Sequence, residues 1–339
     1  MNFNNEMPRR IKVFPLAVLQ VAASVILALS TRLGLLHVGV FFISVACAMF
    51  ALQIMISRSY WYFVAASVSV CAAYLIGGLF PCVMSAFCVP VGALTAYMIK
   101  KKSTKMSLVA ALDVVYIALF AGLFLAVYLL AGYEFSVPAI TEHFSGVVDA
   151  VRDSFMSNIT DDIKDIVVKS MRIKEEEFIL LMETAFETLK LILPAIIISA
   201  IGIVAYLTAH VFKLGTVLSG CELLLPDPKW ETLPSKVCAT VYCLAYVAYS
   251  FTMIISSKIG VFFVVCYSIV IIFTPVMMLM GIKWVLTLRN KGFVIALFIF
   301  GAFIMADFAA MLLGFFGIKE VFARHDKIKK QEEQNNRKE

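Results

Sequence analysis

Two aspartates stand inside long apolar stretches, where a carboxyl group could bind a proton, an ion or a polar substrate. Asp307 lies near the middle of the predicted span 293–317, and Asp113 lies about two turns into the span 107–132. A carboxylate at such a depth costs roughly 2.5–3.5 kcal/mol, so each should face the protein interior and have a partner. Both are candidate substrate or ion contacts. A structural hydrogen bond between helices is an equal alternative for Asp307, and pairing with Lys105 is the favoured alternative for Asp113.

Small residues recur at four-residue steps around Asp307. A ridge of this kind on one helix face lets a neighbouring helix approach closely. Because Asp307 borders the ridge, we expect helix packing and the buried carboxyl group to share one face. The packing residues are Ala302, Ala306, Ala310 and Gly314.

Patterns for enzyme chemistry are missing from this sequence. It contains no GxxxxGK[ST] phosphate loop, no HExxH and no GxSxG. Its four histidines include no pair at helical metal-ligand spacing, and its eight cysteines form no CxxC pair. The sequence therefore predicts a protein that is not an enzyme, with no catalytic residues, no metal site, no cofactor and no nucleic-acid partner.

Composition and hydropathy predict the elements that hold these residues. Of 339 residues, 62% are hydrophobic and 15% are charged, against about 25% charged in soluble domains. The apolar residues form blocks long enough to cross a hydrocarbon core about 30 Å thick. Backbone groups inside a bilayer need internal hydrogen bonds, so the blocks should be helices. We predict an all-α, polytopic transmembrane bundle with spans near 13–30, 34–56, 60–79, 82–99, 107–132, 189–213, 237–257, 260–282 and 293–317.

The distribution of lysine and arginine predicts the orientation of the chain. Basic clusters at 9–12 and 100–105 flank four crossings, so both can be cytoplasmic. The N-terminus is then on the cytoplasmic side of a bacterial cell membrane. Nine spans would place the basic C-terminal tail outside, whereas eight would place it inside, and the count stays open. The predicted regions are a five-span membrane region (1–132), an extracytoplasmic segment (133–188), a second membrane region (189–317) and a charged tail (318–339).

The extracytoplasmic segment has the pattern of surface helices. Ile140, Phe144, Val147, Val151 and Phe155 recur at spacings of three and four, which is typical of an amphipathic helix. Acidic residues outnumber basic ones here, as expected outside the membrane. The segment is either a solvated helical cap or a lid and partner-docking element.

Three further features concern the packing of the spans. Gly77-Gly78-Leu79-Phe80-Pro81 predicts a turn between the third and fourth spans. Gln20 and Gln53 could bind another helix or a polar ligand. Pro90 and Pro194, like the proline at 275, should kink or break their helices.

Short motifs resemble the YybS-like family of bacterial membrane proteins, a family without an assigned activity. A basic stop follows Val91-Gly92-Ala93, and a Trp-x-x-Leu-Pro turn occurs at Trp230, Leu233 and Pro234. The segment from Gly317 to Phe322, with Arg324, is similar to the family's Gly-Leu-x-Asp-x-Trp…Arg ending. Glu320 stands where the family has Asp, Phe322 where it has Trp, and the Arg comes about two positions early. The resemblance implies a membrane location more than a chemistry.

Two functions follow from these features. The N-terminal helices are similar in style to the substrate-binding membrane subunits of energy-coupling-factor vitamin transporters, which depend on separate ATPases. The chain could thus be a small-molecule transport or substrate-binding component that works with an energy-coupling module. Alternatively, it could be a membrane scaffold or regulatory partner in envelope or cell-division processes, binding other membrane proteins. Membrane lipid is a partner in both cases.

Overall fold

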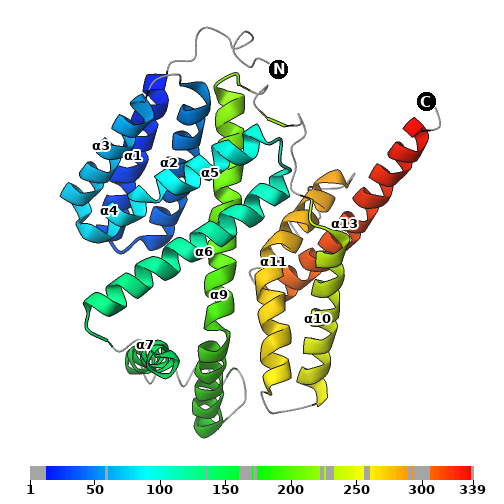
Figure 1. Cartoon of the computed structure of the whole chain (residues 1–339). Coiled ribbons are helices and arrows are strands. Elements are labelled where there is room, and N and C mark those ends of the chain that lie inside the picture. Colours follow the sequence, from blue (N-terminus) through cyan, green and yellow to red (C-terminus); the bar gives the residue numbers. More distant parts are fainter. Residues whose placement is uncertain are drawn as a thin grey trace. The chain divides into compact units, whose positions relative to one another are not determined.

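The computed structural model describes most of the chain. The described residues are 13–57, 60–133, 136–159, 170, 174–221, 225–226, 233–255, 260–288, 292 and 306–336. Within these ranges the chain is all-helical and contains no strand, which confirms the predicted all-α class. Eleven helices are described there (Figure 1): α1 (Val13–Arg32), α2 (Leu36–Ile56), α3 (Trp61–Gly77), α4 (Leu79–Ala86), α5 (Cys88–Lys100), α6 (Lys105–Leu130), α7 (Val137–Asn158), α9 (Glu175–Leu218), α10 (Lys236–Ile255), α11 (Val261–Thr287) and α13 (Ala306–Asn336).

The helices form two compact units. Unit 1 comprises Met1–Ala121 and Ala200–Pro234, and unit 2 comprises Gly122–Ser199 and Ser235–Glu339. Two long helices, α6 and α9, begin in one unit and end in the other. The division between the units therefore falls inside helices, at positions other than the sequence-based boundaries after residues 132, 188 and 317.

Unit 1 is built around α1 and α2. Helix α1 packs on α2 and α3, and α5 packs on α2 (Figure 1). The contact between α5 and α2 is close because Gly92 has no side chain: a Cβ there would lie 2.6 Å from Cδ1 of Phe50 and 3.0 Å from the carbonyl oxygen of Cys47. The C-terminal part of α9 packs on α2 in the same way, with Gly215 against the side chain of Leu52.

The predicted turn at residues 77–81 is present. Helix α3 ends at Gly77, and Gly78 has φ +85°, a conformation that favours glycine. Helix α4 starts directly afterwards, and Phe87 separates it from α5. Pro90 lies in the first turn of α5, where a proline is tolerated. The predicted span 82–99 is thus made of two short helices.

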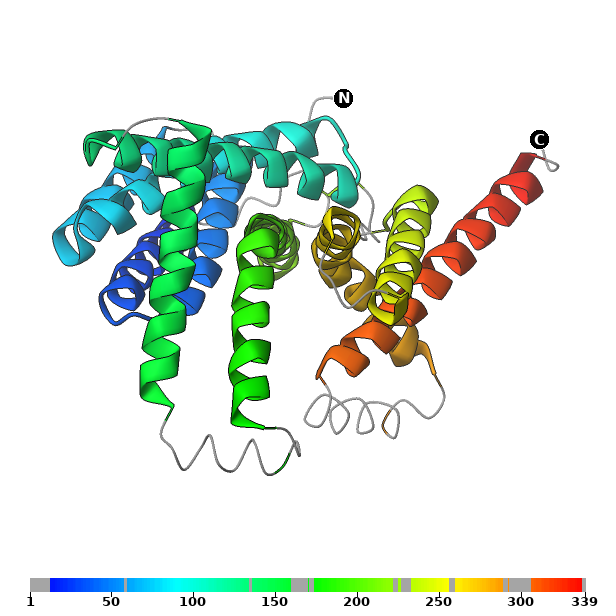
Figure 2. The same cartoon turned by 90° about the horizontal axis from the view of Figure 1, so that it is seen from below.

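In unit 2, helix α7 lies beside the first half of α9, and Figure 2 shows the two running side by side. Ser136 caps α7 by accepting a hydrogen bond from the Ala139 amide at 3.3 Å. Phe155 meets Phe186 with ring centroids 6.0 Å apart. The amphipathic pattern predicted for the segment 133–188 is therefore realised in α7. Its end at 188 is not a helix boundary, because α9 continues from Glu175 to Leu218.

Also in unit 2, helices α10, α11 and α13 form a three-helix bundle. Helix α13 extends from Ala306 to Asn336, so most of the predicted charged tail is the continuation of a helix. Its first turn beyond residue 318 is packed: Val321 is fully buried and Glu320 nearly so. Arg324 donates a hydrogen bond to Glu320, and Lys236 lies 2.6 Å from Asp326.

Several of these helices are long and apolar enough to cross a membrane. Five satisfy both conditions within the described residues: Phe14–Arg32, Leu79–Lys100, Lys105–Leu130, Glu175–Leu218 and Val261–Thr287. Shorter apolar helices run over Phe41–Ile56 and Trp61–Gly77. The predicted eight or nine spans are not reached by this count, and the predicted span 293–317 falls largely outside the described residues.

The surfaces of these helices carry large apolar side chains. Leu130 is 85% exposed, Leu75 82% and Leu218 86%. Exposed apolar surface on this scale is unfavourable in water and natural in contact with lipid. Together with the length of the helices, it is compatible with an integral membrane protein.

Candidate functional site

A chain of buried polar side chains runs through unit 1, and it begins with two glutamines. Gln53 on α2 donates a hydrogen bond from Nε2 to Oε1 of Gln20 on α1, at 2.6 Å. Nε2 of Gln20 in turn lies 3.6 Å from the Cys88 sulfur on α5. All three residues are fully buried. Paired amides of this kind satisfy each other where no water is available, and they join three helices here.

A second set of polar contacts joins α6 and α9 to the same core. The Tyr116 hydroxyl lies 2.9 Å from Oγ1 of Thr208, and both residues are fully buried. Cys47 on α2 is fully buried and lies near both Tyr116 and Cys88. We call the six residues Gln20, Gln53, Cys88, Cys47, Tyr116 and Thr208 the polar chain. It links five helices: α1, α2, α5, α6 and α9.

Asp113 lies one turn before Tyr116 on α6, close to α9. Its side chain is half-buried, and Oδ1 is enclosed without a hydrogen-bond partner in the protein. A Cβ at Gly202 on α9 would lie 3.8 Å from that oxygen, so the missing side chain leaves room beside the carboxyl group. No ion pair to Asp113 is present in the described part of the chain.

Lys105, the lysine expected near Asp113, has other neighbours. It is only 4% exposed, and its Nζ lies 3.5 Å from Nδ1 of His210 and 5.0 Å from the centre of the Tyr206 ring. The rings of Tyr206 and His210 are stacked with centroids 5.9 Å apart. This arrangement fixes the N-terminus of α6 to α9 within unit 1. It also holds a cation over an aromatic face.

Among the described residues of unit 1, three other polar atoms are buried without a hydrogen-bond partner. They are Oγ of Ser24 on α1, Oε1 of Gln53 on α2 and Oγ of Ser85 on α4. An unsatisfied buried group costs about 1–3 kcal/mol. A small polar molecule reaching these atoms would recover that energy.

The other predicted site lies on α13, and only part of it is described. Ala302 is outside the described residues, and Ala306 and Asp307 lie in the first turn of α13 with side chains that are not described. Ala310 is half-buried. Gly314 packs against Tyr242 of α10, whose hydroxyl would overlap a Cβ at that position.

The closest helix contact in unit 2 was not among the predicted packing residues. A Cβ on Gly281 of α11 would overlap the Leu313 carbonyl, and one on Gly317 of α13 would overlap the Met277 carbonyl. The two glycines thus bring α11 and α13 into backbone contact. Gly317 lies three residues after Gly314, and this spacing of small residues in the sequence could have indicated the contact.

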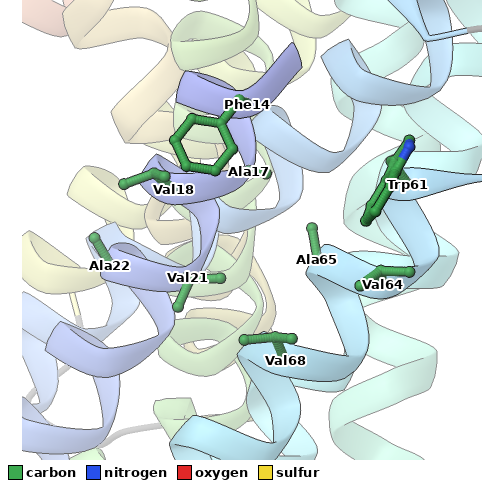
Figure 3. Close-up of a pocket in the computed structure, with 9 residues that line it drawn as sticks. All are labelled: Phe14, Ala17, Val18, Val21, Ala22, Trp61, Val64, Ala65 and Val68. Carbon is green, nitrogen blue, oxygen red and sulfur yellow. The ribbon is translucent and has the colours of Figure 1, made fainter.

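An apolar groove opens between α1 and α3 in unit 1 (Figure 3). Its volume is about 690 Å³, and Phe14 and Trp61 stand on its two walls. The remaining lining residues are Ala17, Val18, Val21, Ala22, Val64, Ala65 and Val68. Apart from the indole N–H of Trp61, this lining is apolar, so the groove is a surface for apolar groups such as lipid chains.

Metal ligands do not gather in the part of the chain that the structure describes. No cluster of three or more His, Cys, Asp or Glu side chains is found there. The eight cysteines are all free thiols. Among the described residues, the polar chain and Asp113 are therefore the chemical groups on which a site in unit 1 can be built.

Comparison with family models, with curated proteins and with solved structures finds no match to this chain. Fold and composition define the class, a helical protein with several apolar helices compatible with integration into a membrane. Any more particular function has to be argued from the geometry of unit 1.

Proposed function

We propose that this protein binds a small polar or cationic molecule within unit 1, as a transport or substrate-binding component of a bacterial cell membrane. The observation that carries the proposal is the Asp113 carboxyl group, which lies in an apolar helix with one oxygen enclosed and unpartnered. An ionisable group is costly inside a membrane, and groups that persist there commonly contact a substrate or an ion.

The surroundings of Asp113 support a binding role. Gly202 leaves room beside the carboxyl group, and Tyr116 lies on the same side of α6, three residues further on. Tyr116 leads into the polar chain, which ends at the unpaired Oε1 of Gln53. A carboxylate, a hydroxyl and an amide oxygen together suit a ligand that donates hydrogen bonds or carries positive charge.

The proposal assigns no catalytic step to this chain and no ATPase of its own. Transport would then depend on an ion gradient or on a separate energy-coupling module. The resemblance to the YybS-like family belongs to the same proposal.

Asp113→Asn tests the binding role because it keeps the size of the side chain and removes its charge. The protein would be purified from membranes, and its bound small molecules would be identified by native mass spectrometry followed by extraction. We expect a polar or cationic molecule on the wild type that is reduced at least about tenfold in the variant.

Asp326→Asn is the matched control, because Asp326 lies on the exposed part of α13 and pairs with Lys236. It should keep the bound molecule. Equal ligand content in the wild type and Asp113→Asn would contradict the proposal. A fall in the amount of folded Asp113→Asn protein would instead favour a structural carboxyl group.

A scaffold function is the second candidate, and it is favoured by the outer face of α7. Val147 and Val151 are each about half exposed there, and Leu180 on α9 is more exposed still. Apolar residues at helical spacing could receive a partner helix. Crosslinking from a photoreactive residue at position 151 should then capture one partner protein in membranes, and capture of lipid alone would reject this function.

A further inference from the structure

A second cavity lies in unit 2, where the end of α6 meets α7. Its volume is about 490 Å³, within the range of pockets that hold small molecules. Four of the residues that line it can contact a ligand through an aromatic ring or a charge: Tyr128, Tyr133, Glu142 and His143. None of these residues belongs to the polar chain or to the surroundings of Asp113.

Three rings form one wall of this cavity. The centroids of Tyr128 and Tyr133 are 5.0 Å apart, those of Tyr133 and His143 are 5.2 Å apart, and those of Tyr128 and His143 are 5.8 Å apart. Tyr128 is buried at the base, whereas Tyr133 is half exposed. Tyrosine faces carry negative electrostatic potential and attract cations.

The negative charge of Glu142 lies at the same cavity. This carboxylate makes no hydrogen bond or ion pair with a described residue, so its charge is not neutralised by the part of the protein that the structure describes. A carboxylate beside tyrosine faces disfavours an anionic ligand. Glu142 is exposed, so a wholly apolar ligand seated beside it would remove water from the carboxylate without replacing it by a partner.

The floor of the cavity is made by small residues on one face of α7. Ala139, Gly146 and Ala150 recur at helical spacing and line it. A Cβ on Gly146 would meet nothing within 4 Å, so the space above the helix is open. A larger side chain at this position would fill the cavity without moving the backbone.

We propose that this cavity binds a small organic ammonium ion. The ammonium group lies against the half-exposed face of Tyr133, beside Tyr128, and Glu142 balances its charge. Methyl or methylene groups on the nitrogen contact Gly146 and Val147. The ion could be a free compound or the headgroup of a lipid, because the cavity adjoins the last turn of α6, a candidate membrane span.

Calorimetric titration tests this site with tetramethylammonium chloride as the probe. The full chain would be held in nanodiscs of phosphatidylglycerol, which has no ammonium group. We expect saturable binding that sodium chloride does not produce. The neutral compound 3,3-dimethylbutan-1-ol carries a tert-butyl group, which is an isostere of a trimethylammonium group. It should bind at least about tenfold more weakly, because it lacks the charge that the tyrosines and Glu142 recognise.

Four variants separate the contributions of charge, ring and space. Glu142→Gln and Tyr133→Leu should each weaken binding about tenfold, and Gly146→Leu should abolish it. Tyr133→Phe keeps the ring and should stay within about twofold of the wild type. Gly122→Leu is the matched control for size, since Gly122 also faces open space in unit 2.

Repeating the titration in phosphatidylcholine nanodiscs identifies the source of the ion. A lipid headgroup in the site would compete and lower the apparent affinity for tetramethylammonium, whereas a site for free ions would keep the same affinity in both lipids. The proposal is overturned if binding in phosphatidylglycerol is not saturable, if the neutral isostere binds equally, or if Gly146→Leu binds as well as Gly122→Leu. These outcomes do not depend on Asp113, so they are distinguishable from failure of the function proposed for unit 1.

Discussion

Unit 1 and the α10–α11–α13 bundle of unit 2 both contain close glycine contacts, but unit 1 adds a set of buried polar contacts between its helices. In unit 1 the helices meet through buried polar groups, such as Gln20 with Gln53 and Tyr116 with Thr208. In the bundle the closest contacts are made by glycines, which allow α11 and α13 to touch through their backbones. Both means are effective in a membrane, where burial of apolar surface gives helices little reason to associate.

The comparison separates a region that can bind polar molecules from one that is packed by shape. Polar groups inside unit 1 can exchange their partners for those of a ligand, and four buried polar atoms in its described part have no hydrogen-bond partner. A glycine contact offers no polar side chain to a ligand, because it depends only on the close fit of two backbones. We therefore expect substitutions in the two regions to lower stability for different reasons: steric overlap in the bundle and unpaired polar groups in unit 1.

The largest effect is expected from Gly281→Ala in the bundle. The new Cβ would overlap the Leu313 carbonyl, which belongs to the backbone of α13 and cannot rotate away. We expect a loss of about 3 kcal/mol in unfolding free energy, the upper end of what overpacking usually costs. Trp284 stacks on Phe316 of α13, so its fluorescence during unfolding in detergent reports the change.

Gly260→Ala is the control for this change, because a Cβ at Gly260 meets open space at the start of α11. It should alter stability by less than about 0.5 kcal/mol. Equal stability of the two variants would show that α11 and α13 do not touch at Gly281.

A smaller effect is expected from Gln53→Leu in unit 1. It leaves Oε1 of Gln20 buried without its donor, at a cost of about 1–2 kcal/mol. The double variant Gln20→Leu/Gln53→Leu removes both amides and should cost less than the sum of the two single changes. A double-mutant cycle measured by denaturant unfolding gives this coupling, and strict additivity would mean that the two glutamines do not interact.

Tyr116→Phe should have a smaller effect still, about 1 kcal/mol, because it removes one hydroxyl and keeps the ring. The substitution removes the hydrogen bond between the Tyr116 hydroxyl and Oγ1 of Thr208, which are 2.9 Å apart. Tyr74→Phe is the control, since Tyr74 is exposed on α3 of the same unit. Thermal unfolding of both variants in the same detergent measures the difference, and identical melting temperatures would argue against a buried hydrogen bond at Tyr116.

The smallest effect is expected where α7 meets α9, because the contact there is a single, partly buried ion pair near the surface. Lys190 Nζ lies 2.8 Å from Oδ1 of Asp149, and its hydrogen bond holds the pKa of that carboxyl group below its usual value. Because the pKa of Asp149 is lower in the folded state, the ionised carboxylate stabilises the folded contact at pH values above the unfolded pKa of about 3.9. This stabilisation is lost as the pH falls through the folded pKa.

Hydrogen exchange of α7 at decreasing pH, corrected for the intrinsic rate, measures this effect. Protection should fall only a few-fold, as for other surface ion pairs. Asp149→Asn should remove the pH dependence, whereas Asp153→Asn should retain it, since Asp153 contacts Arg152 and not Lys190. An unchanged pH dependence in Asp149→Asn would assign it to another group.

Local features of the fold could be predicted from the sequence. Gly77 to Pro81 indicated a turn, and α3 ends there with Gly78 at positive φ. The amphipathic pattern from Ile140 onward indicated a surface helix, and α7 has it. These features depend on residues close together in the chain, where propensity and periodicity act directly.

Boundaries were harder to predict where one helix continues through a change in composition. Helix α9 passes from the acidic Glu175–Glu177 into an apolar stretch without a break, although the sequence suggested a boundary near 188. Helix α13 likewise continues through the charged residues after 318. Composition changes with the surroundings of a helix, but the backbone hydrogen bonds that define the helix do not.

The candidate site could be predicted only in part. Asp113 was identified because a carboxyl group in an apolar stretch is costly. Gln20 and Gln53 were recognised as polar contacts without known partners. Tyr116 and Thr208 gave no signal, because a tyrosine and a threonine are common in apolar helices and 92 residues separate them.

The sequence by itself determined that this protein is helical, apolar and suited to a membrane, because those properties follow from composition and from the length of each apolar block. The tertiary structure decided which polar groups meet. Hydrogen bonds between helices depend on rotation, depth and crossing angle, and residues distant in the chain fix these together. For that reason the pairing of Gln20 with Gln53, the unpartnered oxygen of Asp113 and the cavity beside Glu142 were visible only in three dimensions.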